Sequence, residues 1–107
     1  MLTATSARAN MEPVKRHLNI TWSDTDTEAK LIDQMRDAEV ALNHKLGATI
    51  DYFVPGAERR LYLAYMLYSW NDCLNEFDSA YRAEIIQIRH KYEVAASSST
   101  EDETDEE

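Results

Sequence analysis

Three histidines and one cysteine are the side chains of this chain best suited to ligate zinc or to act as nucleophiles. A zinc site brings three or four such ligands together, often with a His-x-x-x-His pair on one helix. His17, His44 and His90 fall in three different expected elements, and Cys73 has no second cysteine to pair with. We therefore expect no metal site, no catalytic cysteine and no disulfide within the chain.

The acidic run from Asp24 to Glu28 resembles the start of a calcium-binding loop. Such a loop needs a glycine at its sixth position and a bidentate glutamate at its twelfth. Those positions hold Ala29 and Met35, so the acids are better explained as residues at a helix start, where negative charge is favourable. With only two glycines, the chain also has no glycine-rich phosphate loop. The sequence predicts a protein that is not an enzyme and has no cofactor.

The negative charge of the chain is concentrated at its C-terminal end. The 107 residues carry a net charge of -9, and residues 101–107, EDETDEE, hold six of the 20 acids. This block repels itself and has nothing apolar to bury, so we expect disorder from about residue 95. It is either a solubility tail or an acidic arm that docks on a basic partner surface or repels DNA.

The expected elements are all helical, and they form one domain. We expect a flexible extension at residues 1–10, an α-helical domain at residues 11–94 and a disordered acidic tail at residues 95–107. The longest apolar run, Leu61 to Trp70, is about half the length needed to cross a bilayer. The first ten residues lack the apolar core of a secretory signal, so we expect a soluble intracellular protein.

A short helix is expected at residues 12–18, opened by Pro13, and Ile20 and Trp22 should then point into the core. A long helix should begin between Ser23 and Thr27, where Thr25 and Glu28 have the spacing of a capping box. Its apolar stripe recurs at helical spacing, and Gly47 should end it as a left-handed cap. The stripe consists of Leu31, Met35, Ala38, Leu42 and Leu46.

Both glycines and the second proline fall in residues 47–56, so the chain should turn back there into an antiparallel helical hairpin. Apolar residues of this turn, Ile50, Tyr52, Phe53 and Val54, should pack over one end of the hairpin. A second helix should start at Ala57, and polar residues predict a break near residues 75–79, where Asp78 or Ser79 can cap a last helix. That helix carries an apolar stripe at Tyr81, Ile85, Ile88 and Tyr92.

The aromatic helix from Arg59 to Phe77 is apolar on nearly every side, and a domain of this size has few elements to cover it. Part of its surface should therefore belong to a partner. The expected hydrophobic core of the hairpin comprises Leu31, Met35, Leu42, Leu63, Leu67 and Trp70.

Five segments carry a resemblance to a known family. They are VKRHLNI at 14–20, SDTD at 23–26, LNHKLG at 42–47, IDYFVPG at 50–56 and ERRLYLAYMLYSWNDCLNEFDSAY at 58–81. In these segments and in the order of its elements, the chain resembles the small α-helical head-tail connector (adaptor) proteins of long-tailed bacteriophages. The resemblance covers about residues 11–94, and the acidic tail lies outside it.

The resemblance implies a structural virion protein of the neck, assembled in the host cytoplasm. Such adaptors form a ring under the portal protein, here of about twelve copies to match a portal. The ring extends the DNA channel and presents a docking surface to a stopper or tail-completion protein. DNA passes through it without sequence-specific binding, and no membrane is involved.

Within this arrangement we assign three sets of residues as hypotheses. Subunit contacts are expected from the tyrosine face formed by Tyr62, Tyr65 and Tyr68. Portal contacts are expected from Tyr81, Arg82, Arg89, Lys91 and Tyr92. The channel lining is expected from Asp33, Asp37 and Glu39, whose negative charge would keep DNA from adhering.

Two other functions remain open from the sequence alone. A small helical inhibitor or binding module could use the acidic tail to mimic nucleic acid, and it would stay a monomer or dimer. A DNA-packaging subunit would bind DNA with strong salt sensitivity. The basic cluster of Arg82, Arg89, His90 and Lys91 precedes the acidic block by only about ten residues, so direct readout of DNA bases is not expected.

Overall fold

The described part of the chain is built from helices and contains no strand, which confirms the all-α class. A computed structural model describes residues 2–22 and 24–106, with side chains up to residue 95. The helices are α1 (Ala4–Ala9), α2 (Met11–His17), α3 (Thr25–Leu46), α4 (Ala57–Trp70), α5 (Phe77–Ala80) and α6 (Arg82–Glu106), with a 3₁₀ turn, η1 (Leu74–Glu76), before α5.

Helix α3 starts in the expected run and ends at the expected glycine. Its N-cap is Asp24, whose carboxylate accepts hydrogen bonds from the backbone N–H groups of Asp26 (2.9 Å) and Thr27 (3.2 Å). The capping box expected from Thr25 is therefore wrong by one residue, because the extended backbone of Asp24 lets its carboxylate reach these donors. Gly47 has φ +69°, as a left-handed cap requires.

The apolar stripe of α3 is confirmed as the centre of the core, because all five of its residues are fully buried. Helix α4 packs against it through a face that differs from the expected one. The buried residues of α4 are Leu61, Tyr62, Ala64 and Met66, whereas Leu63, Leu67 and Trp70 are only half-buried. A helix that is apolar all round gives no sign of which face its neighbour will cover.

The turn between α3 and α4 closes one end of the core as expected, through Ile50 and Tyr52. The ring of Tyr52 stacks on Tyr62 with centroids 5.1 Å apart, and its hydroxyl donates to Asn43 Oδ1 at 2.8 Å. Two inward placements are wrong: Val54 and Trp22 are each 52% exposed. Ile20, which was paired with Trp22 in the expectation, is buried.

The first ten residues differ from the flexible extension that we expected. Residues 4–9 form α1, opened by a capping box between Thr3 and Ser6. Leu2 and Ala7 are buried, and the backbone N–H of Leu2 donates to Glu39 Oε1 on α3 at 2.8 Å. The burial of Leu2 and Ala7, this buried hydrogen bond and an ion pair between Arg8 and Glu28 (3.1 Å) thus hold this segment against α3.

The expected break in the second half of the chain is confirmed, and it begins earlier than predicted. Helix α4 ends at Trp70, and Asp72 takes a left-handed conformation with φ +62°. Asp78 and Ser79 lie inside α5 and cap no helix. Helix α6 continues to Glu106, so the backbone is helical beyond residue 95, where we expected disorder.

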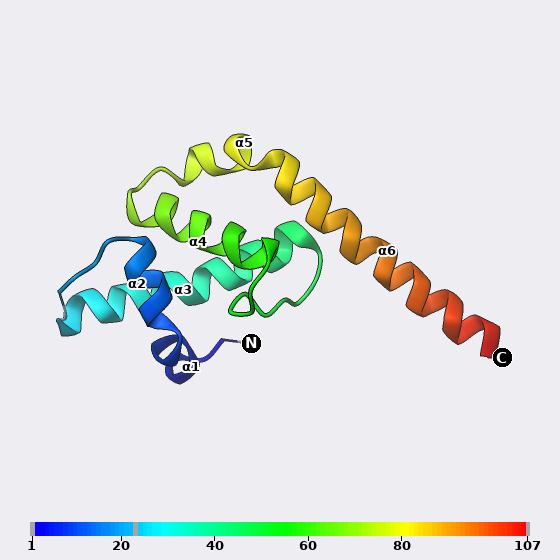
Figure 1. Ribbon diagram of the computed structural model, residues 1–107, viewed down its shortest axis with the longest axis horizontal. Helices are drawn as coiled ribbons and strands as arrows, with labels where there is room; N and C mark the ends of the chain where they lie inside the picture. The colour runs from blue at the N-terminus through cyan, green and yellow to red at the C-terminus, as the bar shows by residue number, and fades with distance from the viewer. Residues whose placement is uncertain (1, 23, 107) are drawn as a thin grey trace.

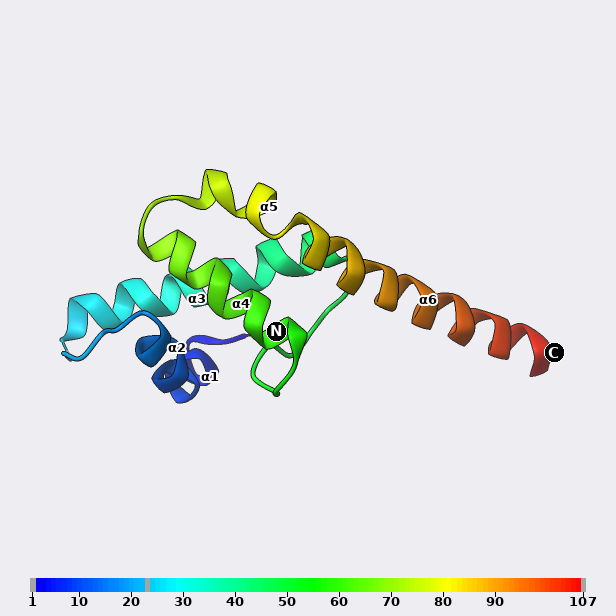
Figure 2. The same ribbon diagram turned by 45° about the horizontal axis from the view of Figure 1, so that its top comes forward.

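Helices α3 and α4 lie side by side and run in opposite directions, with α1 and α2 packed at one side of the pair (Figure 1). The first turns of α6 contact α3 and α4, and its second half leaves the rest of the molecule, as both ribbon views show (Figures 1 and 2). The molecule is therefore elongated, with extents of 56 × 31 × 19 Å. We call α1 to α5 with the first turns of α6 the body.

Candidate functional site

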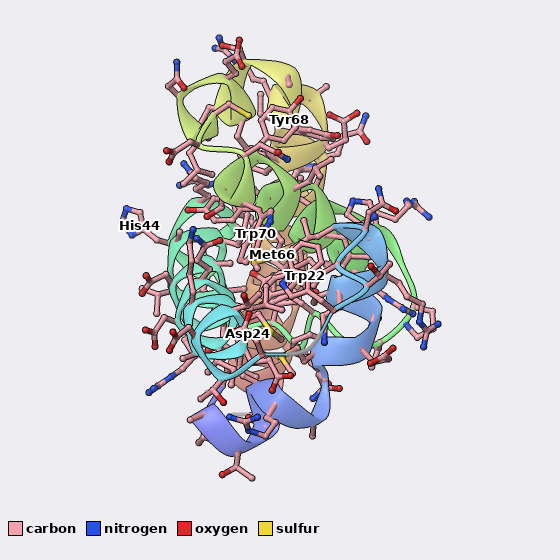
Figure 3. The ribbon with its side chains drawn as sticks, turned by 90° about the vertical axis from the view of Figure 1, so that its left-hand side faces the viewer. Trp22, Asp24, His44, Met66, Tyr68 and Trp70 are labelled. Carbon is pink, nitrogen blue, oxygen red and sulfur yellow. The ribbon has the colours of Figure 1, made fainter. Side chains whose placement is uncertain are left out.

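The side chains that could ligate metals do not gather. Within residues 2–22 and 24–95, no three His, Cys, Asp or Glu side chains lie close enough to hold an ion. His44 points away from the body (Figure 3), and the acids at 24–28 include the N-cap of α3. The features that remain as candidates are two surface grooves and the residues around them.

The first is an apolar groove of about 590 Å³ between α4 and the start of α6, which we call the leucine groove. Its floor is formed by Leu61, Leu63, Ala64, Leu67, Tyr81 and Ile88. Polar side chains, among them His17, Arg60 and Glu84, stand at its edge. Leu63 and Leu67, expected in the core, are thus part of a surface that the single chain leaves open.

The two tryptophans extend this apolar surface toward the end of the molecule opposite α6. Trp70 follows Leu63 and Leu67 at helical spacing, and Lys30 Nζ lies 4.9 Å from the centre of its ring. Trp22 donates from Nε1 to Thr27 Oγ1 at 3.3 Å. Thr27 and Lys30 are one turn apart on α3, so both tryptophans contact the first two turns of this helix, and Figure 3 labels both in the view of this end.

The tyrosine face proposed for subunit contacts is largely covered within the single chain. Tyr62 is 1% exposed, and its hydroxyl donates to the backbone carbonyl of Met35 at 2.8 Å. Burial raises the pKa of Tyr62. Tyr65 and Tyr68 are half-buried and meet the ring of Phe77 edge-on, at 5.0 and 5.8 Å. Tyr62 is a core residue, and its assignment to an exposed interface is corrected.

The residues proposed for the portal lie in three places. Tyr81 lines the leucine groove, Arg82 and Arg89 line a second groove described below, and Lys91 and Tyr92 contact Glu58. Lys91 Nζ (3.0 Å) and the Tyr92 hydroxyl (2.9 Å) both donate to Glu58 Oε2, which ties α6 to the start of α4. Burial raises the pKa of Glu58, but these two hydrogen bonds, the positive charge of Lys91 and a backbone hydrogen bond together hold the pKa below its usual value. Glu58 could not be identified by sequence reasoning, because its partners lie more than thirty residues away along the chain.

The second groove lies between the end of α3 and α6 and has a volume of about 570 Å³; we call it the basic groove. Its lining includes His44, Lys45, Arg82, Ile85, Ile86 and Arg89. Its one acid, Asp78, pairs with Lys45 at 2.8 Å. Arg82 and Arg89 are exposed, and Arg89 pairs with Glu93 on the same helix at 3.2 Å.

The residues proposed for the channel all line one hollow on α3, together with Leu2, Arg36 and Val40, but they differ in exposure. Asp33 and Asp37 are exposed on α3, as a lining requires. Glu39 is 9% exposed and accepts the hydrogen bond from Leu2, so in this fold it positions α1 instead of facing a channel.

No described helix combines the length and the apolar character of a membrane span. Comparison with known proteins gives no relative: no family model, no curated protein and no solved structure matches this chain.

Proposed function

We propose that this chain is a head-tail connector (adaptor) protein that assembles as a ring under a phage portal and extends the DNA channel. The observation that carries the proposal is the leucine groove, together with the exposed tryptophan end beside it. A single copy leaves Leu63, Leu67 and Trp70 half-covered on one side of α4. The resemblance described above supplies the biological setting for that unsatisfied surface.

The groove is large enough to matter for assembly. Burying one large apolar side chain contributes about 1.5–3 kcal/mol, so completing the burial of three half-exposed ones contributes roughly 2–4 kcal/mol per contact. Tryptophan is also enriched among residues that dominate interface energies. In a ring every subunit makes this contact with a neighbour, so no copy keeps the surface open.

In this proposal the antiparallel pair of α3 and α4 is the subunit body of a small helical bundle. Helix α6 leaves the body and supplies a surface for neighbouring subunits or the portal. Asp33 and Asp37, without Glu39, contribute negative charge to the channel. The neck of the virion is the proposed location, and the surface around the exposed Trp22 is the proposed docking surface for a stopper or tail-completion protein.

The decisive experiment mixes the full-length protein with purified portal protein and measures the mass of the complex, with ring formation checked by electron microscopy. Leu67→Glu should abolish or strongly weaken ring formation, because it places a charge in the leucine groove. Val54→Glu is the matched control, since Val54 is exposed in the α3–α4 turn, away from this groove. Both variants should stay helical and folded by circular dichroism.

A wild-type protein that neither binds portal nor forms a ring with it would overturn the proposal. Tight binding to a basic host protein as a monomer or dimer would favour the small inhibitor instead. DNA binding that disappears steeply with added salt would favour a packaging subunit.

A further inference from the structure

We infer that the acidic end of α6 in one copy, residues 101–107, binds in the basic groove of a neighbouring copy. This inference rests on the proposed self-assembly and names one contact within it. It also reassigns Arg82 and Arg89 from the portal to a second copy of this chain.

The first support is charge complementarity within one molecule. The chain is strongly acidic, yet the lining of the basic groove combines Lys45, Arg82 and Arg89 with a single acid, Asp78. Among the side chains that the structure describes, Arg82 has no ion-pair partner. Residues 101–107 carry six negative charges in seven positions. The groove and the acidic segment therefore carry opposite charges, and Arg82 is the cation of the groove that no described side chain pairs with.

The second support is the path of α6, which prevents the segment from reaching its own groove. Arg89 lines the groove, and Glu101 lies twelve residues later on the same helix. At a rise of 1.5 Å per residue, the acidic block begins about 18 Å beyond Arg89 and points away from the body. Figures 1 and 2 both show the end of α6 well clear of the other helices. A helical α6 can deliver these acids only to another molecule.

The third support is the chemistry of the groove floor. Ile85 is half-buried and Ile86 is 56% exposed, so the cations stand beside apolar surface. Exposed ion pairs contribute only about 0.2–1 kcal/mol each, but a helix end lying in the groove would make several at once and would cover Ile86 as well. An arginine also donates two parallel hydrogen bonds to one carboxylate, which favours these partners over lysine alone.

The resulting contact is heterologous, because the tip of α6 and the basic groove are different surfaces of the same molecule. Repeated head to tail, such a contact gives a closed ring or an open filament, whereas reciprocal exchange between two copies would give a two-fold dimer, which the mass of the assembly distinguishes from a ring. The inference therefore agrees in symmetry with the ring proposed above.

The test identifies which copy donates the tail. Equal amounts of ¹⁴N- and ¹⁵N-labelled full-length protein are assembled with portal and treated with a carbodiimide, which joins carboxylates to nearby amines without a spacer. We expect a link between Lys45 and residues 101–107, and because copies mix at random, about half of the linked pairs should join a heavy peptide to a light one. Links found only between peptides of the same isotope would overturn the inference.

Charge exchange separates this contact from a portal contact. Changing Arg82 and Arg89 to glutamate, or the six tail acids to lysine, should each weaken assembly about fivefold or more at low salt. Combining the two sets in one chain should restore assembly, because a portal contact made by the arginines would not be rescued by the tail. The matched control, Arg16→Glu with Arg36→Glu, changes the same charge outside the basic groove and should assemble normally.

The outcomes distinguish this inference from the proposed function. Assembly on portal that is unaffected by tail neutralisation would overturn the inference and leave the adaptor proposal intact. Failure of the wild-type protein to assemble at all would count against both.

Discussion

The hydroxyl of Tyr62 donates a hydrogen bond to the backbone carbonyl of Met35 at 2.8 Å, at a buried point where α4 meets the middle of α3. Tyr62 also lies between Tyr52, on which it stacks, and Phe53, which meets it edge-on at 5.3 Å. One side chain thus connects α3, α4 and the turn between them. This explains why the tyrosine belongs to the core although its spacing suggests an exposed face.

Tyr62→Phe should lower the free energy of unfolding by about 1–2 kcal/mol, because it removes one buried hydrogen bond and retains the ring. For a domain of this size, Tm should fall by about 5 °C or more. Urea unfolding followed by circular dichroism measures the change. Tyr65→Phe is the control, since Tyr65 is half-buried on the same helix, and equal losses in both variants would contradict this account.

Glu58→Gln should loosen α6 from the body, because the carboxylate accepts from both Lys91 and Tyr92. We expect a loss of about 1 kcal/mol in unfolding free energy and faster hydrogen exchange in residues 84–95. The control is Glu93→Gln, which removes an acid from the exposed side of α6 and should leave the hydrogen exchange of residues 84–95 unchanged. Unaltered exchange in Glu58→Gln would show that other contacts hold α6.

The same residue predicts a pH dependence. Folding lowers the pKa of Glu58, so its contribution to stability is fully present above the usual pKa of 4.5 and is lost as pH falls through the lower pKa of the folded state. Stability measured from neutral to acidic pH should therefore fall less steeply in Glu58→Gln than in the wild type. Parallel curves would contradict the assignment.

Glu39→Ala should release α1, because the backbone N–H of Leu2 loses its acceptor. The expected cost is about 1–2 kcal/mol, with increased proteolysis within residues 1–10. Glu39→Gln keeps an oxygen acceptor and should retain most of the stability. Asp37→Ala, at an exposed position of α3, is the control. If Gln and Ala at position 39 behave alike, the hydrogen bond is not what holds α1.

Asp24→Ala should lower Tm more than Thr25→Ala, because Asp24 is the N-cap of α3. The hydrogen bond from the Thr27 side chain, with those from the backbone of Thr27 and Asp26, lowers the pKa of Asp24. The difference between the two variants should therefore shrink as pH falls and the carboxylate becomes protonated. A larger loss of Tm in Thr25→Ala would instead support Thr25 as the N-cap, as the capping-box spacing in the sequence suggested.

Local patterns predicted the helices well. The stripe from Leu31 to Leu46, the glycine after it and the start of α4 at Ala57 each depend on spacing or on one residue's backbone preference. The face of α4 was not predictable, because apolar residues surround the helix and the choice is made by the fit of Tyr62 and Met66 against α3. The packing of α1 was not predictable either, because it involves a hydrogen bond from Leu2 to Glu39, which is 37 positions away in the sequence.

The candidate sites were predictable only as lists of residues. The leucine groove joins Leu67 to Ile88, and the basic groove joins Lys45 to Arg82. Both depend on the angle at which α6 leaves η1 and α5, and no local pattern encodes that angle. The sequence indicated surplus apolar surface on the aromatic helix, but it assigned that surplus to tyrosines instead of to leucines and Trp70.

Helix α6 can convert a small change in its packing on the body into a large displacement of its C-terminal end. It runs without interruption to Glu106, so its tip lies about 27 Å beyond Ile88, the last of its residues in the leucine groove. By simple geometry, a tilt of about 10° around Ile88 displaces the tip by about 5 Å. The position of a molecule bound at the tip of α6 therefore depends on how α6 packs near Leu63 and Glu58. A ligand that fills the leucine groove and tilts α6 would displace that bound molecule.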